Sequence, residues 1–256
     1  MSIVRTLVSA PHARRRRRGA LVVSLAAVAG VMATATPSQA IIGGSSVPAA
    51  ESWMVSLYND SSGGFCGGTL IDRQWVLTAA HCVAVGRDMK DLRVRVGSDN
   101  KSAGGTVADV SDIVAHPSWA FSDGAGDGTD LALLKLKQPV DQKPLKLNKK
   151  SPAVGTPARV LGWGNMCIDD DCWPEKLQEV TLPVSEKRDG RFAIQDKESR
   201  GVAPGDSGGP LVVKDKGAWR LAGVTSNARE LGGGAGAESN FTDVAQYRDW
   251  ISEIIR

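Results

Sequence analysis

The stretch Gly205-Asp206-Ser207-Gly208-Gly209-Pro210 decides how the rest of this chain is interpreted. Three glycines within six residues indicate backbone angles or close approaches that a Cβ would block. Such a loop lets backbone N–H groups converge beside the serine hydroxyl, as a nucleophile requires. The alternative is an ordinary Gly-rich turn before the strand Leu211–Val213. Two upstream stretches favour the nucleophile, because they supply a histidine and an aspartate.

A serine hydroxyl is a weak nucleophile at neutral pH and needs a neighbouring base. Of the three histidines, only His81 and His116 lie beyond residue 40. His81 is next to Cys82, where a disulfide would fix its loop, so we expect His81 to be the base. His116 precedes Pro117 in a strand-to-turn segment, and we expect it to be structural or exposed.

The base in turn needs a carboxylate that orients it. Three aspartates, Asp123, Asp127 and Asp130, occur in one Gly-rich loop. Asp130 immediately precedes the apolar run 131–134 and is therefore the one expected to be buried and fixed. Asp123 and Asp127 are expected to be solvated turn residues.

The first 40 residues have the features of a secretory signal peptide. A basic segment, Arg14–Arg18, precedes an apolar stretch, Ala20–Ala35, and small residues lead to Ala40. A retained membrane anchor is disfavoured because the apolar stretch is short and interrupted. A twin-arginine signal is a further alternative. Cleavage after Ala40 would free Ile41 directly, whereas cleavage after Ala35 would leave a short propeptide, 36–40.

Removing this segment reverses the charge of the chain. The whole sequence has 31 Lys and Arg against 28 Asp and Glu, but six of the arginines and none of the acids lie before residue 41. The remaining 25 basic residues give residues 41–256 a net charge of −3. The basic character of the full chain is therefore no argument for nucleic acid binding. The local basic run Lys143–Lys150 is expected to be a solvated turn.

All four cysteines lie in the exported part, which favours two disulfides in an oxidising compartment. Three pairings are possible. Proximity along the chain suggests Cys167–Cys172, which leaves Cys66–Cys82. A zinc site is disfavoured because the spacing is not C-x₂-C. The acidic run 169–171 between two of the cysteines is expected to be a solvated loop, with calcium binding as the alternative.

Residues 41–256 predict a mainly β structure. Short apolar runs alternate with Gly, Pro, Asn, Asp and Ser clusters, which is typical of an all-β sandwich or barrel. The C-terminus differs, because apolar residues there recur at helical spacing, and we expect an amphipathic helix over Val244–Ile255. The expected strands are Trp53–Tyr58, Thr69–Ile71, Trp75–Thr78, Leu92–Val96, Val110–Ala115, Leu131–Leu136, Ala158–Leu161, Leu177–Val184, Pro210–Val213, Arg220–Thr225 and Ser239–Thr242.

At this point the chain resembles the chymotrypsin-like and trypsin-like serine proteases, the peptidase family S1, in a secreted bacterial form. The triad residues follow the family order His, Asp, Ser. Further stretches resemble the family over nearly all of residues 41–256: Ile41-Ile42-Gly43-Gly44, Thr78-Ala79-Ala80-His81-Cys82, Asp130-Leu131-Ala132-Leu133-Leu134, Gly162-Trp163-Gly164, Gly205 to Pro210 and Phe241-Thr242-Asp243-Val244. The resemblance implies two six-stranded antiparallel β-barrels, a C-terminal α-helix and an active site between the barrels.

The resemblance also implies a role for each matching residue. Ser207 would be the nucleophile, His81 the general base and Asp130 the carboxylate that fixes the imidazole tautomer. The backbone N–H groups of Gly205 and Ser207 would form the oxyanion hole. Ser226 would line the cleft beside the catalytic aspartate.

Two further family features concern activation and cross-linking. A freed amine of Ile41 would pair with Asp206 and complete the oxyanion hole. An unpaired buried charge is very costly, so each of these groups would need the other. Cys66 and Cys82 match the family disulfide that flanks the catalytic histidine.

The substrate pocket departs from the family pattern. Gly201 stands where trypsin-like members have the aspartate that recognises Lys and Arg, so a preference for basic side chains is not expected. Asn227, Ala228 and Ser239 stand at wall positions where an aromatic residue and glycines are usual. Ala203 replaces a cysteine of the family's pocket disulfide. These changes favour small or flat apolar side chains.

The sequence therefore predicts a secreted, extracellular serine endopeptidase acting as a monomer through an acyl-enzyme. Polypeptides are the expected substrates, and a proteinaceous inhibitor is a conceivable partner. No cofactor, metal, nucleic acid or membrane partner is expected once the signal is removed. A secreted esterase on the same fold is the first alternative, and a non-catalytic binding protein is the second.

Overall fold

The computed structural model describes residues 41–59, 63–83, 91–119, 129–165, 172–231 and 236–256. Several expectations fall outside these ranges: the signal peptide with its cleavage sites, Asp123, Asp127, Cys167 and the acidic run 169–171. No helix among the described residues is long and apolar enough to cross a membrane.

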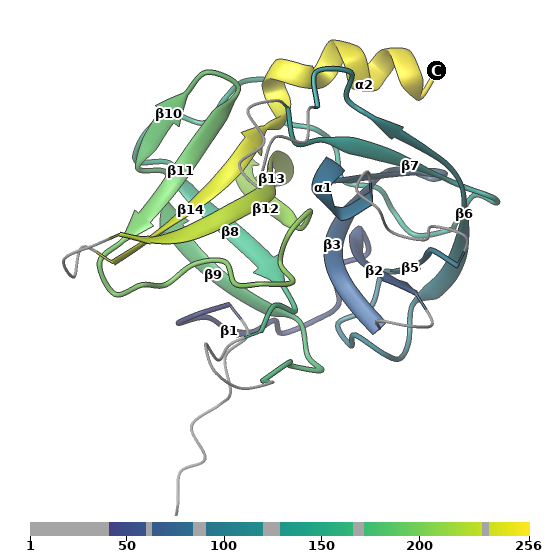
Figure 1. Cartoon of the computed structure of the whole chain (residues 1–256), viewed down its shortest axis with the longest axis horizontal. Coiled ribbons are helices and arrows are strands. Elements are labelled where there is room, and N and C mark those ends of the chain that lie inside the picture. The colour runs from purple at the N-terminus through teal and green to yellow at the C-terminus, as the bar shows by residue number, and fades with distance from the viewer. Residues whose placement is uncertain (1–40, 60–62, 84–90, 120–128, 166–171, 232–235) are drawn as a thin grey trace, which may run out of the picture. The chain divides into compact units, whose positions relative to one another are not determined.

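Six antiparallel strands in the first half close into a barrel, in the order β2-β3-β4-β7-β6-β5. They lie together on the right of Figure 1. Their side chains follow the burial expected of strands: β5 alternates half-buried arginines with buried valines, while all four residues of β4 are buried. The strands are β2 (Met54–Asn59), β3 (Gly63–Asp72), β4 (Trp75–Thr78), β5 (Arg93–Val96), β6 (Thr106–Ala115) and β7 (Ala132–Leu136).

The second half forms an antiparallel sheet in the order β1-β9-β8-β12-β13-β14-β11-β10. Short edge strands, β1 (Ser45–Ser46) and β10 (Glu186–Arg188), extend the six longer ones. The longer strands are β8 (Pro157–Gly162), β9 (Gln178–Pro183), β11 (Arg191–Asp196), β12 (Pro210–Asp215), β13 (Ala218–Leu231) and β14 (Gly236–Asp243). The mainly β fold is confirmed, although the ladder of this sheet does not close as that of the first barrel does.

The strand predictions are confirmed in place; β3, β6, β8, β12, β13 and β14 are longer than predicted, while β5, β7 and β9 are one or two residues shorter. Three strands were missed. β1 and β10 are short and have no apolar run, whereas β11 contains the short buried run 192–194, which was overlooked. The C-terminal helix is confirmed as two pieces, the 3₁₀ turn η2 (Val244–Tyr247) and α2 (Arg248–Ile254). Asp243 begins this segment by accepting a hydrogen bond from the Ala245 N–H, a normal capping contact.

The buried apolar side chains form two clusters, and the larger one includes the barrel core and residues of the second half such as Leu161 and Leu221. The barrel core contains fully buried side chains such as Leu57, Leu77 and Leu133. The core of the second sheet includes Phe192 and Phe241, whose rings stack with centroids 5.6 Å apart. Ile41 is fully buried in this second core, so the first described residue is packed into the protein.

Candidate active site

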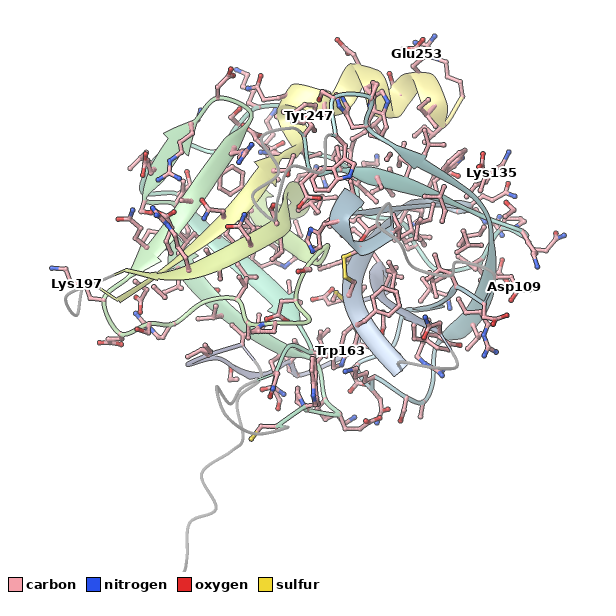
Figure 2. The ribbon with its side chains drawn as sticks, viewed as in Figure 1. Asp109, Lys135, Trp163, Lys197, Tyr247 and Glu253 are labelled. Atoms are coloured by element: carbon pink, nitrogen blue, oxygen red, sulfur yellow. A yellow bond between two sulfur atoms is a disulfide. The ribbon has the colours of Figure 1, made fainter. Side chains whose placement is uncertain are left out.

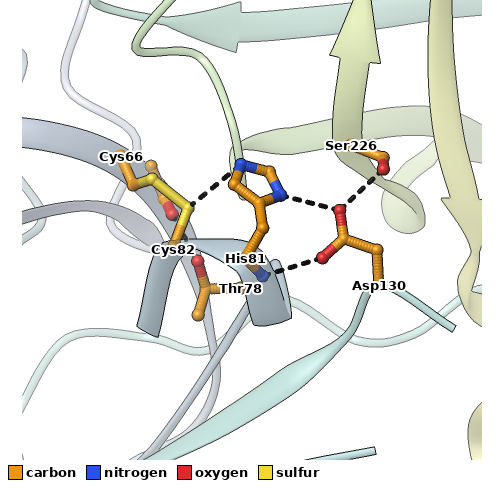
Figure 3. Close-up of a disulfide and its surroundings, with 7 residues drawn as sticks. Cys66, Thr78, His81, Cys82, Asp130 and Ser226 are labelled. Atoms are coloured by element: carbon orange, nitrogen blue, oxygen red, sulfur yellow. Dashed lines mark hydrogen bonds and ion pairs between the residues drawn. A yellow bond between two sulfur atoms is a disulfide. The ribbon is translucent and has the colours of Figure 1, made fainter. Parts of the chain in front are cut away.

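His81 lies on the short helix α1 (Ala80–Val83), directly after β4, and its ring faces Asp130 (Figure 3). Nδ1 of His81 lies 2.8 Å from Oδ2 of Asp130. The backbone N–H of His81 donates to Oδ1 of the same carboxylate at 3.0 Å. Two contacts therefore fix both the ring and the chain of His81 relative to one aspartate, and Nδ1–H donates to that aspartate when Nε2 is free to accept.

Asp130 is nearly buried and accepts a third hydrogen bond, at 2.6 Å, from the Ser226 hydroxyl. Burial by itself would raise the pKa of this carboxyl. The hydrogen bond and charge of His81, the Ser226 hydroxyl and the His81 N–H outweigh burial and hold the pKa of Asp130 below its usual value. The carboxylate therefore stays ionised at neutral pH.

Cys66 and Cys82 form a disulfide with Cα atoms 6.3 Å apart, as predicted. It connects β3 to α1 immediately beside His81. The two sulfur atoms and a ring nitrogen of His81 lie within 4.8 Å of one another, but a disulfide offers no thiolate to a metal. Cys172 is also disulfide-bonded, and its predicted partner Cys167 is outside the described ranges.

The loop that carries Ser207 needs two of its glycines for different reasons. Gly205 has φ +97°, and a Cβ there would come within 2.5 Å of the Trp173 ring. Gly208 has φ +76°, and a Cβ there would press into the Gly67 carbonyl at 2.5 Å. Both positions thus lie in the left-handed region and against a neighbour, as the sequence predicted.

Backbone hydrogen bonds tie this loop to both halves of the site. The Gly67 N–H donates to the Ser207 carbonyl at 2.7 Å, next to Cys66 of the disulfide. The Gly208 N–H donates to the Thr225 carbonyl at 2.8 Å, next to the Ser226 that binds Asp130. The two hydrogen bonds thus connect the Ser207 loop to the residues next to Cys66, whose disulfide flanks His81, and next to Ser226, which binds Asp130.

The Ser207 hydroxyl itself makes no hydrogen bond with any described residue. Nε2 of His81 lies 3.7 Å from Sγ of Cys82, a weak contact. Hydrogen bonds between nucleophile and base are often long in a site without substrate.

Asp206 is completely buried, and within the described ranges only backbone N–H groups donate hydrogen bonds to its carboxylate. Its carboxylate accepts from the N–H groups of Gly164 at 2.7 Å and Ala203 at 2.8 Å. Burial outweighs these bonds and raises the pKa of Asp206 to about 7. Gly164 belongs to the Gly-Trp-Gly stretch noted in the sequence, so that stretch contacts Asp206.

The start of the described chain lies against Gly201, just before the pocket-lining residues 202–204, and Asp206 forms no ion pair with any residue that the structure describes. Ile42 pairs with Gly201 through two backbone hydrogen bonds of 3.1 Å. Ile41 is still joined to residue 40 in this chain, so its nitrogen carries no charge.

A pocket of about 120 Å³ opens beside Ser207. Asn227 and Ala228 line it, as predicted, together with Val202, Ala203, Pro204 and Thr225. The lining is therefore small and mainly apolar. Ser226, the third predicted residue on this strand, instead binds Asp130.

Gly201 and Ser239 do not line this pocket but contact each other. The Ser239 hydroxyl accepts from the Val202 N–H at 3.1 Å and occupies the space into which a Cβ on Gly201 would project. Ser239 also faces Ala228 across the β13–β14 pair. The nearby Asp196 carboxylate forms a salt bridge with Arg200 at 2.8 Å, so this carboxylate is already paired within the protein.

His116 takes a structural position at the C-terminal helix. Its ring packs edge-on against Tyr247 and Trp250, with centroids 5.2 and 4.9 Å away, and Nδ1 is hydrogen-bonded with the Ser118 hydroxyl at 2.8 Å. Burial lowers the pKa of His116. Tyr247 is labelled in Figure 2 beside this segment.

Sequence reasoning missed several supports of the site. Thr242 donates to the Asp130 carbonyl at 3.2 Å, and Thr78 donates to the Gly67 carbonyl at 2.8 Å. Trp173 covers Gly205, and Lys101 lies 4.3 Å above the Trp173 ring. These contacts join residues distant in sequence, and no local pattern indicates them.

Comparison with known proteins gives a consistent result. The family model described as Trypsin matches residues 41–251. The chain is 35% identical to "Trypsin 5G1" of Aedes aegypti, over 84% of each chain. It is 31% identical to "Chymotrypsin-like elastase family member 3B" of Homo sapiens, over 92% of this chain and 96% of that one. It is 35% identical to "Tryptase" of Mus musculus, over 79% of this chain and 84% of that one.

Proposed function

The chain belongs to the trypsin family of serine-type endopeptidases, and from this membership we propose that Ser207, His81 and Asp130 are its catalytic triad. The observation that carries the proposal is the pair of contacts from His81 to Asp130, at 2.8 Å from Nδ1 and 3.0 Å from the backbone N–H. They leave Nε2 as the ring nitrogen available to a nucleophile.

Acylation follows from this arrangement. Ser207 Oγ attacks the carbonyl carbon of the scissile bond while Nε2 of His81 takes its proton. The ionised Asp130 stabilises the imidazolium that forms. Nε2 then gives the proton to the leaving amine, and the carbon–nitrogen bond breaks.

The backbone N–H groups of Gly205 and Ser207 stabilise the negative oxygen of the tetrahedral intermediate. Each such donor contributes roughly 3 kcal/mol in enzymes of this kind. Water then attacks the acyl-enzyme with His81 again as the base, which frees the acid product and Ser207. The positive φ of Gly205 supports this role, since it turns the loop backbone beside the serine.

We propose that Asp206 receives the freed amine of Ile41 once the preceding segment is removed. The carboxylate is buried, accepts from two backbone donors and forms no salt bridge among the described residues, although the more distant charge of Lys101 acts to lower its pKa. An ammonium group there would satisfy both charges. Ile41 already packs in the same core as Val202, close in sequence to Ala203, which binds Asp206.

The pocket supports a preference for small apolar side chains before the scissile bond. Ala228 narrows it, and no carboxylate lines it among the described residues. Strong cleavage after Lys or Arg is therefore not expected. Export by the N-terminal segment, an extracellular site of action and a monomeric state complete the proposal.

The test compares peptide and ester substrates under identical conditions, with a phosphonate that modifies active serines. We expect both substrates to be hydrolysed, and the label to be lost in Ser207→Ala. Ester cleavage without proteolysis would favour the esterase, and absence of both activities would favour a binding protein.

A further inference from the structure

A basic groove of about 920 Å³ lies away from the catalytic residues. One wall is the connection between the two halves, Lys146–Pro152, which contains most of the basic run expected to be a solvated turn. The end of β12 and the turn after it, Val213–Lys216, also line the groove. Backbone hydrogen bonds fix the connection: the Asn148 N–H donates to the Leu221 carbonyl at 2.7 Å, and the Leu221 N–H to the Lys146 carbonyl at 3.0 Å. The basic run is thus attached to the sheet as one wall of the groove.

The charge of the groove opposes that of the rest of the exported chain. Its walls carry five exposed lysines: Lys146, Lys149, Lys150, Lys214 and Lys216. Two half-buried arginines, Arg220 and Arg248, complete it, and Asp215 is the one acidic residue among the lining residues. Seven of the 25 basic residues of a net acidic chain therefore converge on this groove.

Two of these cations contact Trp219: Lys214 lies 5.1 Å from the centre of its ring, and Arg220 donates to its carbonyl at 3.0 Å. Within the described residues, none of the seven forms a salt bridge, although acidic residues are in excess. Nε of Arg248 is buried and has no hydrogen-bond partner within the described ranges. An unsatisfied buried donor costs about 1–3 kcal/mol unless a partner reaches it. The groove thus holds both unpaired charge and an unpaired donor.

The floor is apolar. Ile71 from β3, Leu147, Pro152 and Val213 lie among the cations, and Pro152 and Val213 are buried. A purely sulfated or phosphorylated polymer would use the cations and leave this floor without a partner. A polypeptide with alternating acidic and apolar side chains would use both.

We propose that this groove is an exosite that binds an acidic polypeptide segment with interspersed apolar side chains. The groove end of β12 lies roughly 15 Å along the strand from Pro210. A polypeptide bound in the groove would therefore not overlap the substrate residue whose peptide bond Ser207 attacks. A protein substrate or partner with such a segment would be held at the groove and at the active site simultaneously, which raises the effective concentration of the second contact.

The test measures binding of a fluorescent peptide of Glu, Asp and Leu to the protein secreted from the full chain, with Ser207→Ala to prevent cleavage of the probe. The groove variant is Lys149→Glu with Lys150→Glu. The control is Lys187→Glu with Lys197→Glu, two exposed lysines outside the groove with the same change in charge. Lys197 is labelled at the left of Figure 2.

We expect the groove variant to bind the peptide about tenfold more weakly and the control to bind it as the parent does. Binding should weaken between 0.1 M and 1 M salt, as the Debye length falls from about 10 to about 3 Å. An equal loss in both variants, or none in the groove variant, would overturn the proposal. So would lysine-dependent binding of dextran sulfate without binding of the peptide. The assay measures binding without turnover, so its result does not depend on whether Ser207, His81 and Asp130 form a catalytic triad.

Discussion

Asp130 and Asp206 are both buried carboxylates, yet their surroundings move the pKa of each in opposite directions. Asp130 accepts from a ring nitrogen, a hydroxyl and an amide, which keep its pKa low despite burial. Asp206 has two amide donors, and burial raises its pKa to about 7. The difference matches the proposed roles. Asp130 would remain ionised throughout the reaction, whereas Asp206 would become ionised when the freed amine of Ile41 binds to it.

At this scale we expect Asp130→Asn to reduce kcat by about 10⁴-fold at neutral pH. The amide would hold the wrong imidazole tautomer, so that Nε2 carries a proton and cannot act as a base. Steady-state kinetics on a peptide substrate measure this, with Asp112→Asn, an exposed residue of β6, as the matched control. A loss below about tenfold in Asp130→Asn would contradict the assigned role.

The candidate site residues could be predicted from the sequence where a local pattern carries them. Ser207 stands in a Gly-rich stretch and Asp130 precedes an apolar run. Ser239 shows the limit: it was predicted to line the pocket, but it does not, and its hydroxyl accepts from the Val202 N–H. A side-chain direction of this kind depends on a hydrogen-bond partner from another strand, which no spacing along the chain reveals.

At the scale of elements, a buried carboxylate joins the strands behind the substrate pocket. Glu238 on β14 has no exposed side-chain area and binds Arg188 of β10 at 3.2 Å and Arg229 of β13 at 3.0 Å. Gln195 of β11 donates to it at 2.9 Å. Asn240 donates both to Glu238 and to Asn227 of the pocket lining, at 3.1 Å each. Four strands thus meet at one side chain, in a chain without the family's pocket disulfide.

We expect Glu238→Gln to destabilise the protein by about 1–3 kcal/mol at pH 7 and to raise KM more than it lowers kcat. Burial alone would raise the pKa of Glu238, but its hydrogen bonds from Gln195, Arg229, Asn240 and Arg188 lower it to about 2. Because the folded pKa is below the ordinary 4.5, the stabilisation is full above that value and is lost as pH falls through about 2.

Urea unfolding of Glu238→Gln and of the parent at pH 7 and at low pH measures this difference. Glu186→Gln is the control, because Glu186 also binds Arg188 but is exposed. Equal stabilities of the parent and Glu238→Gln at pH 7 would show that the buried carboxylate does not join these strands energetically.

The β strands show what the sequence reveals about elements and what it does not. Apolar runs predicted every strand of the closed barrel, because burial on the barrel interior requires them. β10 escaped prediction because its three residues, Glu186–Arg188, are all charged and give no apolar pattern. β11 was overlooked although it carries a short apolar run, 192–194, that is buried.

At the scale of the whole molecule, the proposed activation would link the N-terminus to the active site through Asp206. While Ile41 remains joined to residue 40, the pKa of Asp206 is about 7 against an ordinary 3.8. The native state then binds a proton that the unfolded state has lost. Stability should therefore fall as pH rises from about 4 to about 7, by an amount on the order of 4 kcal/mol.

A chain that begins at Ile41 should not show this fall, since its amine would keep Asp206 ionised. Unfolding by urea across this pH range, in Ser207→Ala to prevent self-cleavage, compares the two N-termini. Identical pH dependence in both chains would separate Ile41 from Asp206 and remove the proposed activation step.

The central claim, that Ser207 is acylated during turnover, is tested most directly by mass spectrometry of the enzyme with a slowly hydrolysed ester. The account predicts an increase equal to the acyl group, located on the fragment that contains Ser207 and absent in Ser207→Ala. Continued hydrolysis with no acyl group on that fragment, or at an unchanged rate in Ser207→Ala, would contradict it.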